Sequence, residues 1–150
     1  MKLICTGKPS KVLRSEARAA VLFYTNLLMP KKRNKNITLR IRFVRGFRKK
    51  WYAMGGVRWI DKGSHPKNMA IDIDADLTKH STFLTLAHEM VHFKQYVTGE
   101  LQDFRAKRVT KWQGNLVDED RIYYYDLPWE IEAHGREMGL YVRWRELNDR

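Results

Sequence analysis

Apolar residues that recur at helical spacing between residues 77 and 97 constrain the fold of this chain more than any other feature. The recurring residues are Leu86, Met90, Phe93 and Val97, at positions i, i+4, i+7 and i+11. This spacing places them on one side of an α-helix. Gly99 follows and is a typical helix stop. We therefore expect a helix over residues 77–97 whose apolar side packs into the core.

Two further helices are expected near the two ends of the chain. Residues 10–29 leave a mostly apolar helical face, and Pro30 ends this helix because proline cannot continue it. Asp126 followed by Pro128 is typical of a helix start, since aspartate caps the first turn and proline fits within it. This last helix is expected to run to about residue 147.

Three strands are expected between the first and the middle helix. Residues 37–43 alternate with period two, so one face lies in the core while Arg40 and Arg42 point outward. A second strand is expected at residues 51–60, interrupted by its two adjacent glycines, and a third at residues 68–74. The chain therefore combines helices and strands in one sequence of elements.

Length and composition limit the chain to one domain. It has 150 residues, of which 43% are hydrophobic and 31% charged, a balance typical of a folded domain. Residues 100–126 show a turn at 112–115 but no regular pattern, so we expect a long loop there. The expected fold class over residues 1–150 is α+β: an N-terminal helix, a three-stranded and mostly antiparallel sheet, a middle helix, a long loop and a C-terminal helix.

The cysteine count and the apolar runs indicate the compartment. Cys5 is the single cysteine and cannot form an internal disulfide, which fits a reducing environment. No apolar run reaches the roughly 18–20 residues that span a bilayer. The apolar stretch at the start of the sequence is also too short for a secretory signal. We expect a cytoplasmic protein without membrane contact, in which histidines and carboxylates hold any metal.

Positive charge is concentrated in the first half of the chain. The formal net charge is +12, and residues 17–60 hold twelve Lys and Arg residues and no acid. Such a segment attracts a polyanion such as nucleic acid, because phosphate contacts release counterions. It fits equally well a solvated face that keeps a sheet edge from pairing. The candidate contact residues are Arg40, Arg42, Arg45, Arg48, Lys49 and Lys50.

Residues 88–92 of the middle helix read His-Glu-Met-Val-His, a match to the motif H-E-x-x-H. Two imidazoles four positions apart point to the same side of a helix and can reach one zinc ion at about 2.0–2.1 Å. Zinc lowers the pKa of a bound water, and Glu89 is placed to take the proton as general base. One Zn²⁺ held by His88 and His92 is therefore expected, with two surface histidines that merely share a face as the alternative.

A catalytic zinc normally takes a third protein ligand, which we expect from the last helix. At 100° per residue, Glu130 lies on the inward face of that helix. The other residues of this face are Ala133, His134, Met138, Tyr141 and Trp144. Glu130 is the favoured ligand, and His134, one turn later, is its rival or a partner of the zinc-bound residues. Glu132 falls on the solvated side, and Glu137 near the inner face is a weaker reserve.

These two motifs resemble those of small gluzincin-type zinc metallopeptidases and of compact zincin-like proteins of phages and bacteria. Such families follow the H-E-x-x-H helix with a helix carrying E-x-x-A-D, whose first Glu binds zinc, and residues 130–134 here read Glu-Ile-Glu-Ala-His. The resemblance covers about residues 68–144 and implies a zincin-like domain with His88, His92 and Glu130 as ligands. His134 stands where the families often have an aspartate that orients a zinc-bound histidine. A SprT-like, DNA-associated protease with three histidine ligands is similar at residues 88–92 and would favour His134.

The resemblance implies two further roles. Zincins commonly bind substrate antiparallel to an edge strand beside the active helix, which would assign Ala70, Ile71 and Asp72 to substrate binding. An oxyanion stabiliser is also expected, because negative charge develops on the carbonyl oxygen in the transition state. One of the tyrosines at residues 123–125 could supply it, although a run of tyrosines is more often packing.

The sequence as a whole favours a zinc metallopeptidase that hydrolyses a protein or peptide substrate, with Glu89 as general base. The alternative is a basic nucleic-acid-binding or adaptor protein whose zinc is structural or whose site is silent. The two hypotheses differ in what Glu89 does, because only a peptidase needs this carboxylate for activity.

Overall fold

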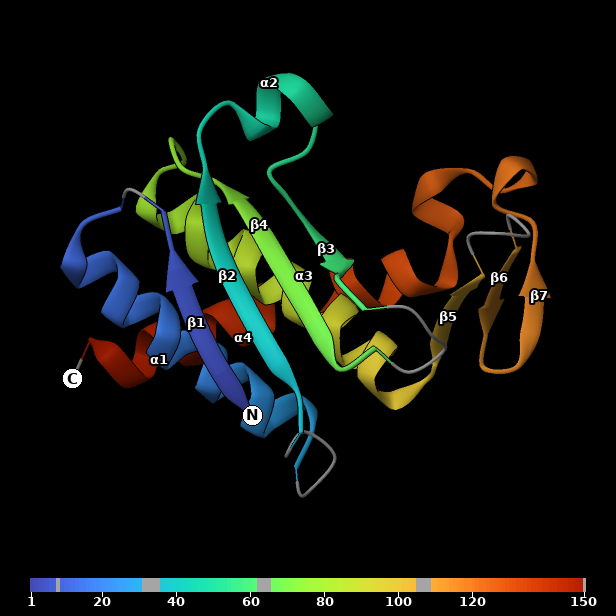
Figure 1. The fold of residues 1–150 in the computed structure, drawn as a ribbon, viewed down its shortest axis with the longest axis horizontal. Coiled ribbons are helices and arrows are strands. Elements are labelled where there is room, and N and C mark those ends of the chain that lie inside the picture. Colours follow the sequence, from blue (N-terminus) through green and yellow to red (C-terminus); the bar gives the residue numbers. More distant parts are fainter. Residues whose placement is uncertain (8, 31–35, 62–65, 105–108, 150) are drawn as a thin grey trace.

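The chain begins with a strand and a helix, and further strands and helices alternate along the rest of it. The structure, a computed structural model, describes residues 1–7, 9–30, 36–61, 66–104 and 109–149. Its elements (Figure 1) are β1 (Lys2–Thr6), α1 (Lys11–Leu28), β2 (Thr38–Val44), α2 (Phe47–Trp51), β3 (Gly55–Trp59), β4 (Asn68–Asp74), α3 (Lys79–Thr98), β5 (Leu101–Phe104), β6 (Val109–Trp112), β7 (Asn115–Val117), two 3₁₀ helices (Glu119–Arg121 and Tyr124–Asp126) and α4 (Pro128–Asn148).

The three long helices begin and end where the sequence signals predicted. The Ser10 hydroxyl accepts a hydrogen bond from the Leu13 amide at 3.1 Å and so caps α1. The Thr78 hydroxyl caps α3 in the same way, and Gly99 ends that helix in the left-handed conformation that glycine adopts without strain. Pro128 occupies the first turn of α4, but the expected cap by Asp126 is wrong, because Leu127 is the N-cap residue and no side chain caps this helix. The helices expected at residues 10–29 and 77–97 and in the last part of the chain are therefore confirmed.

The main sheet has four strands in the order β1-β2-β4-β3. Strands β1 and β2 are parallel, as are β2 and β4, and only β3 pairs antiparallel with β4. The expected three-stranded and mostly antiparallel sheet is wrong in both strand number and direction. The physical reason is that Lys2–Thr6 forms a strand, and α1 then makes the long crossover that two parallel strands need.

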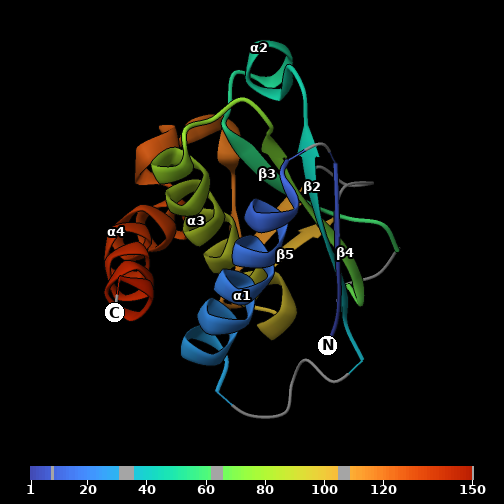
Figure 2. The same cartoon turned by 90° about the vertical axis from the view of Figure 1, so that its left-hand side faces the viewer.

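Helices cover one face of this sheet only. Figure 2 shows α1, α3 and α4 together on one side, with α3 between the sheet and α4. The inward side chains of β2 and β4, such as Leu39, Ile41, Ile71 and Ile73, are fully buried against α1 and α3. No helix among the described residues covers the opposite face. The core therefore lies between the sheet and the helix layer, and α3 runs through its middle.

The segment expected as a long loop, residues 100–126, is wrong as a loop because it forms a small second sheet. Strands β5, β6 and β7 pair antiparallel in that order, and two 3₁₀ helices follow. The turn expected at residues 112–115 is confirmed, with Gln113 and Gly114 at φ 49° and 83° in the hairpin between β6 and β7. Leu101, Leu127 and Trp129 form a separate small core that fixes this sheet beside the start of α4.

The strand expected at residues 51–60 is shorter than predicted. Residues 47–51 form α2, and Tyr52 turns the chain with φ 55°, so β3 begins only at Gly55. The two glycines do not interrupt the strand as expected, because they lie inside it. Among the described residues, no helix combines the length and the apolar character needed to cross a bilayer.

Gly55 fits where any larger residue would collide. A Cβ at this position would lie 2.9 Å from both the Asp72 carbonyl oxygen and Thr85 Cγ2, and 3.4 Å from Glu89 Cγ. We expect Gly55→Ala to lower the free energy of unfolding by about 1–3 kcal/mol, because strand and helix must move apart. Gly56→Ala is the matched control, since its nearest atom, Phe47 Cζ, is 3.7 Å away. Thermal unfolding of both variants checks this, and equal melting temperatures would contradict it.

Candidate metal centre

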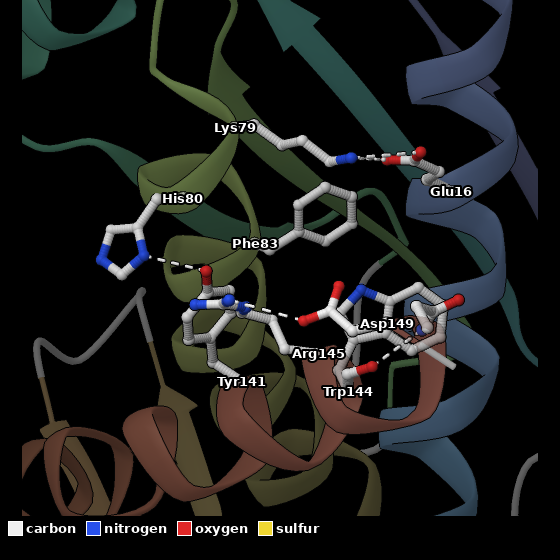
Figure 3. A pocket seen from close by; sticks show the side chains of 9 residues that line it. Glu16, Lys79, His80, Phe83, Tyr141, Trp144, Arg145 and Asp149 are labelled. Carbon is white, nitrogen blue, oxygen red and sulfur yellow. Dashed lines mark hydrogen bonds and ion pairs between the residues drawn. The ribbon is translucent and has the colours of Figure 1, made fainter.

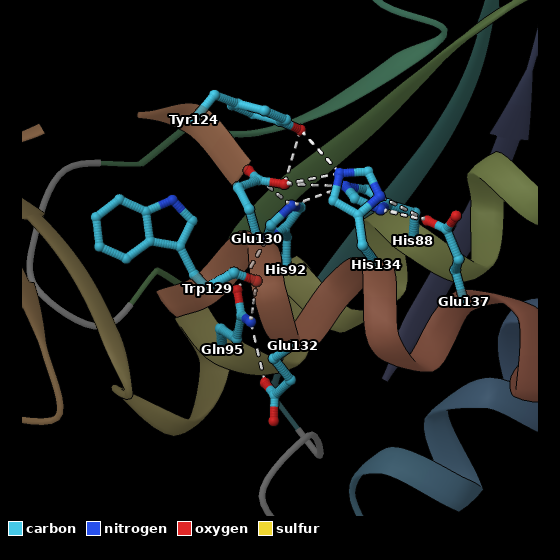
Figure 4. A network of polar contacts seen from close by, with 9 residues as sticks. All are labelled: His88, His92, Gln95, Tyr124, Trp129, Glu130, Glu132, His134 and Glu137. Carbon is cyan, nitrogen blue, oxygen red and sulfur yellow. Dashed lines mark hydrogen bonds and ion pairs between the residues drawn. The ribbon is translucent and has the colours of Figure 1, made fainter. Parts of the chain in front are cut away.

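The H-E-x-x-H residues lie in the most enclosed part of α3. His88, Glu89 and His92 are all buried, as are their helix neighbours on every side. The reason is that α3 packs against the sheet with one side and against α4 with the other. The two histidines point to the same side of α3, as expected, and this side faces α4 rather than open solvent (Figure 4).

Glu130 completes a triangle of metal-ligating atoms with the two histidines. His88 Nε2 and His92 Nε2 are 3.1 Å apart. Glu130 places Oε2 3.3 Å from His88 Nε2 and Oε1 3.2 Å from His92 Nε2. Ligands in a tetrahedron around zinc, at about 2.0–2.1 Å from the ion, lie about 3.3 Å from one another. Glu130 thus turns one oxygen to each histidine, and one donor atom from each of the three residues lies within 4.8 Å of the others. The three residues could therefore hold three corners of a tetrahedral zinc site, with the fourth left for water or substrate.

Gln95 fixes the ring of His92. Its side-chain NH₂ donates both hydrogens, one to the Trp129 carbonyl and one to the Glu132 carboxylate, each at 3.0 Å. The amide oxygen of Gln95 therefore faces His92 and accepts from Nδ1 at 2.8 Å. With one proton held on Nδ1, Nε2 is the nitrogen left for a metal, which would displace the proton that Nε2 donates to Glu130.

Glu137 fixes the ring of His88 in the same manner. Its Oε2 accepts from His88 Nδ1 at 2.6 Å, so Nε2 again points into the triangle. The gluzincin pattern assigns this task to an aspartate one turn after the glutamate ligand, where this chain has His134. In this chain the carboxylate that accepts from His88 belongs to Glu137, which follows Glu130 by seven positions instead of four. Glu137, expected as a reserve ligand, thus has the position of an orienting residue.

The site is rich in negative charge and shifts the pKa values of its members. Burial alone would lower the pKa of His88, but Glu130, Glu89 and Glu137 together raise it to about 9. Burial would raise the pKa of Glu130, yet hydrogen bonds from His88, His92 and Tyr124 hold it well below its usual range. Three carboxylates thus converge on two imidazoles, an arrangement that favours a bound cation.

Glu89 lies next to the ligand triangle and lines two neighbouring cavities of about 610 and 290 Å³. Both cavities are also lined by His88, Gly55 and Tyr124. Burial raises the pKa of Glu89, an effect that the charges of His92 and His88 oppose. Its place beside an accessible cavity puts the Glu89 carboxylate where it can meet a water molecule.

Tyr124 is the one member of the 123–125 tyrosine run that reaches the ligands. Its hydroxyl donates to Glu130 Oε2 at 2.8 Å and lies 3.3 Å from His134 Nε2. Burial and the neighbouring Glu130 carboxylate raise its pKa, so the hydroxyl keeps its proton. Tyr123 and Tyr125 are largely exposed. Of the three candidates for an oxyanion stabiliser, only Tyr124 is held at the site.

His134 lies beside the triangle and outside it. Its ring centroid is 4.5 Å from that of His88, and its Nε2 is 3.8 Å from Glu130 Oε2, with 37% of the side chain exposed. It forms a second possible metal-binding group with His88 and Glu137. Within that group His88 Nδ1 already donates to Glu137, so the triangle with Glu130 is the better zinc site.

Two expectations for the last helix are wrong. Glu132 is not a plain surface carboxylate, because it accepts from Gln95 and pairs with the buried Lys94 at 3.1 Å. Lys94 in turn pairs with Glu100 at 2.9 Å. Met138, expected on the inward face, is 50% exposed, whereas Leu140, Tyr141 and Trp144 further along α4 are buried. Glu132 therefore supports the metal ligands through Gln95.

The strand expected to bind substrate is in the wrong position. Ala70, Ile71 and Asp72 lie in β4, which is hydrogen-bonded to β2 on one side and to β3 on the other. Its backbone cannot pair with a further chain. The edge beside α3 is β3, which has no second partner strand among the described residues, and its Gly55, Gly56 and Val57 line the smaller cavity.

A separate cavity of about 350 Å³ lies at the N-terminal end of α3, between α1, the start of α3 and the end of α4 (Figure 3). Its charged groups are paired with one another: Lys79 with Glu16 at 3.0 Å and Arg145 with Asp149 at 3.4 Å. His80 Nδ1 lies 2.9 Å from the Tyr141 hydroxyl. No metal-ligating triangle occurs there among the described residues. This cavity therefore offers no second metal site among the described residues.

Gln95, Glu137 and Tyr124 are the site residues that sequence reasoning missed or did not select. Gln95 follows His92 by three positions, so helical spacing could have placed its amide beside that histidine. No comparable signal selects Glu137 or Tyr124, because their positions depend on how α4 approaches α3. No protein-family model, curated protein or solved structure matches this chain. The site must therefore be interpreted from its own geometry.

Removing the carboxylate of Glu137 tests the orienting role. We expect Glu137→Ala to weaken zinc binding by about 10- to 100-fold, because the His88 ring loses the acceptor that fixes its orientation. Glu137→Gln should lose less, since its amide oxygen can still accept from Nδ1. Competition with a chromophoric chelator measures both affinities. Wild-type affinity in Glu137→Ala would show that His88 is positioned without this contact.

Proposed function

We propose that this chain is a zincin-like, zinc-dependent metallopeptidase. The observation that carries the proposal is the ligand triangle, in which His88, His92 and Glu130 present donor atoms 3.1–3.3 Å apart on two packed helices. Both histidines have Nδ1 committed to an acceptor, so both direct Nε2 to one point. A set of two histidines and one glutamate with an open fourth position is typical of catalytic rather than structural zinc.

The residues around the triangle have the roles that peptide hydrolysis requires. A bound zinc ion supplies a water of lowered pKa and polarises a carbonyl oxygen. Glu89 accepts the proton from the attacking water and passes it to the leaving amine nitrogen. The Tyr124 hydroxyl, which keeps its proton, can donate to the developing oxyanion after it leaves Glu130.

The free edge of β3 is the place for a substrate chain. An extended peptide that pairs with this edge passes over Gly55 and Gly56, directly beside Glu89 and His92. The larger cavity next to it, lined by Tyr52, Met54 and Leu84 among others, can receive a side chain of the substrate. The cytoplasmic location expected from the single cysteine stays a prediction.

Metal removal tests the proposal. Protein purified without chelator is expected to contain about one zinc ion per chain by elemental analysis, and to hydrolyse unfolded casein. Chelation should abolish the hydrolysis, and added zinc should restore it, because the ion supplies the activated water. His92→Ala should be free of zinc. Protein that contains no metal and takes up none on addition of zinc would overturn the proposal.

A further inference from the structure

The uncovered face of the four-stranded sheet carries a row of arginines. Arg40 and Arg42 project from β2, and Arg58 projects from β3, on the side opposite the helix layer. Arg42 and Arg58 are 43% and 37% exposed and share one acid, Asp72, at 3.6 and 2.8 Å. Asp74, two positions further along β4, accepts a hydrogen bond from the Arg48 amide at 2.7 Å. Three arginines against these two carboxylates still leave this face with an excess of positive charge.

The row continues into the segment around α2. Arg45, Arg48, Lys49 and Lys50 are all exposed, and no acid occurs between residues 45 and 52. Figure 1 shows α2 beyond the end of the main sheet, where β2 leads into it. We call these seven residues the cationic surface: Arg40, Arg42, Arg45, Arg48, Lys49, Lys50 and Arg58. Residues 31–35, which add further positive charge in the sequence, lie outside the described residues.

Two aromatic rings stand exposed at the same place. Trp51 is 60% exposed and Tyr52 is 92% exposed. Tyr52 adopts φ 55°, a left-handed conformation that costs free energy in a residue other than glycine. The Lys50 ammonium lies 5.1 Å from the centre of the Trp51 ring. Neither ring gains much burial from its position, so both are available to a partner.

We propose that the cationic surface, together with Trp51 and Tyr52, binds single-stranded nucleic acid. Lysines and arginines contact successive phosphates, while exposed aromatic rings stack on unpaired bases. Bases in a duplex are already stacked and would not reach these rings without unpairing. This inference does not depend on a bound zinc ion, although Tyr52 also lines the larger cavity beside His88.

The arrangement of the charges favours a flexible strand over a lipid surface. The sheet face and α2 point in different directions, since α2 lies beyond the end of the sheet and not over its uncovered face. The cationic surface therefore extends from the sheet face past the end of the sheet, and a bilayer would have to contact all of it along one plane. A single strand can bend from the sheet face onto α2.

Fluorescence anisotropy with a labelled oligothymidine of about 20 nucleotides tests the proposal, because single-strand sites span up to about 16 nucleotides. The logarithm of the association constant should fall linearly with the logarithm of salt concentration, by about 0.7 per phosphate contacted. Neutralising Lys49 and Lys50 together as Gln should reduce this slope by about 1.4. Trp51→Ala should weaken binding about fivefold or more and leave the slope unchanged.

The matched control removes two charges elsewhere. Arg121→Gln combined with Arg143→Gln lowers the net charge equally, and both residues are exposed on other parts of the molecule. This pair should change the slope little. Equal weakening by both pairs, full binding in Trp51→Ala, or the absence of binding at low salt would each overturn the proposal. Binding to phosphatidylserine vesicles without binding to the oligonucleotide would also overturn it, in favour of a membrane partner.

Discussion

Replacing Glu89 by Gln is expected to lower peptide hydrolysis by about 100- to 10,000-fold while zinc content and fold stay unchanged. The amide has nearly the shape of the carboxylate but cannot accept a proton. Glu89 is not one of the three residues whose atoms form the ligand triangle, so zinc should remain bound. Burial already favours the uncharged form of Glu89, so the neutral amide adds no desolvation cost.

Three measurements on the same preparations distinguish the possible roles of Glu89. Hydrolysis of casein, zinc content and melting temperature are compared in wild type, Glu89→Gln and the exposed-site control Glu146→Gln. The expected pattern is loss of hydrolysis in Glu89→Gln alone. Unchanged hydrolysis in a zinc-loaded Glu89→Gln variant would contradict the general-base role and favour a structural or silent zinc.

The helices could be predicted from the sequence because their signals are local. Ser10, Gly99 and Pro128 each act within one helical turn of the residue they affect. The strand at Asn68–Asp74 was also placed within its observed bounds. These elements depend on short-range periodicity and capping, which a single sequence contains.

The sheet topology could not be predicted because it depends on long-range pairing. Lys2–Thr6 is only five residues long and pairs with a strand that begins at Thr38. Nothing within the short segment shows that it is a strand. Once β1 is missed, the crossover role of α1 is missed too, and the remaining strands look like an antiparallel set. The edge strand was consequently assigned to β4 instead of β3.

The candidate site also combines residues that could be predicted from the sequence with contacts that could not. His88, Glu89 and His92 follow from spacing within one helix, and Glu130 follows from the face it occupies on another. The support by Gln95, Glu132 and Lys94 crosses between α3 and α4 and becomes visible only when the two helices are packed. Local chemistry was therefore readable from the sequence, whereas the contacts that orient it were not.

The choice of third ligand gives the second large expected effect. Glu130→Ala should weaken zinc binding by more than about 100-fold, beyond the loss expected when only an orienting partner is removed. His134→Ala should retain zinc affinity within about tenfold of wild type. The reason is geometric: the Glu130 oxygens lie 3.2–3.3 Å from the two histidine Nε2 atoms, whereas His134 Nε2 is 3.8 Å from Glu130 and partly exposed.

Chelator competition on the two variants, with Glu146→Gln as control, decides between a glutamate and a third histidine as ligand. Loss of zinc in His134→Ala with retention in Glu130→Ala would contradict the ligand triangle and favour three histidines. That result would require the His134 ring to swing toward His92 and displace the Tyr124 hydroxyl, 3.3 Å from its Nε2. Tyr124→Phe would then strengthen zinc binding, whereas with Glu130 as ligand it removes only one hydrogen bond to the carboxylate and should alter affinity little.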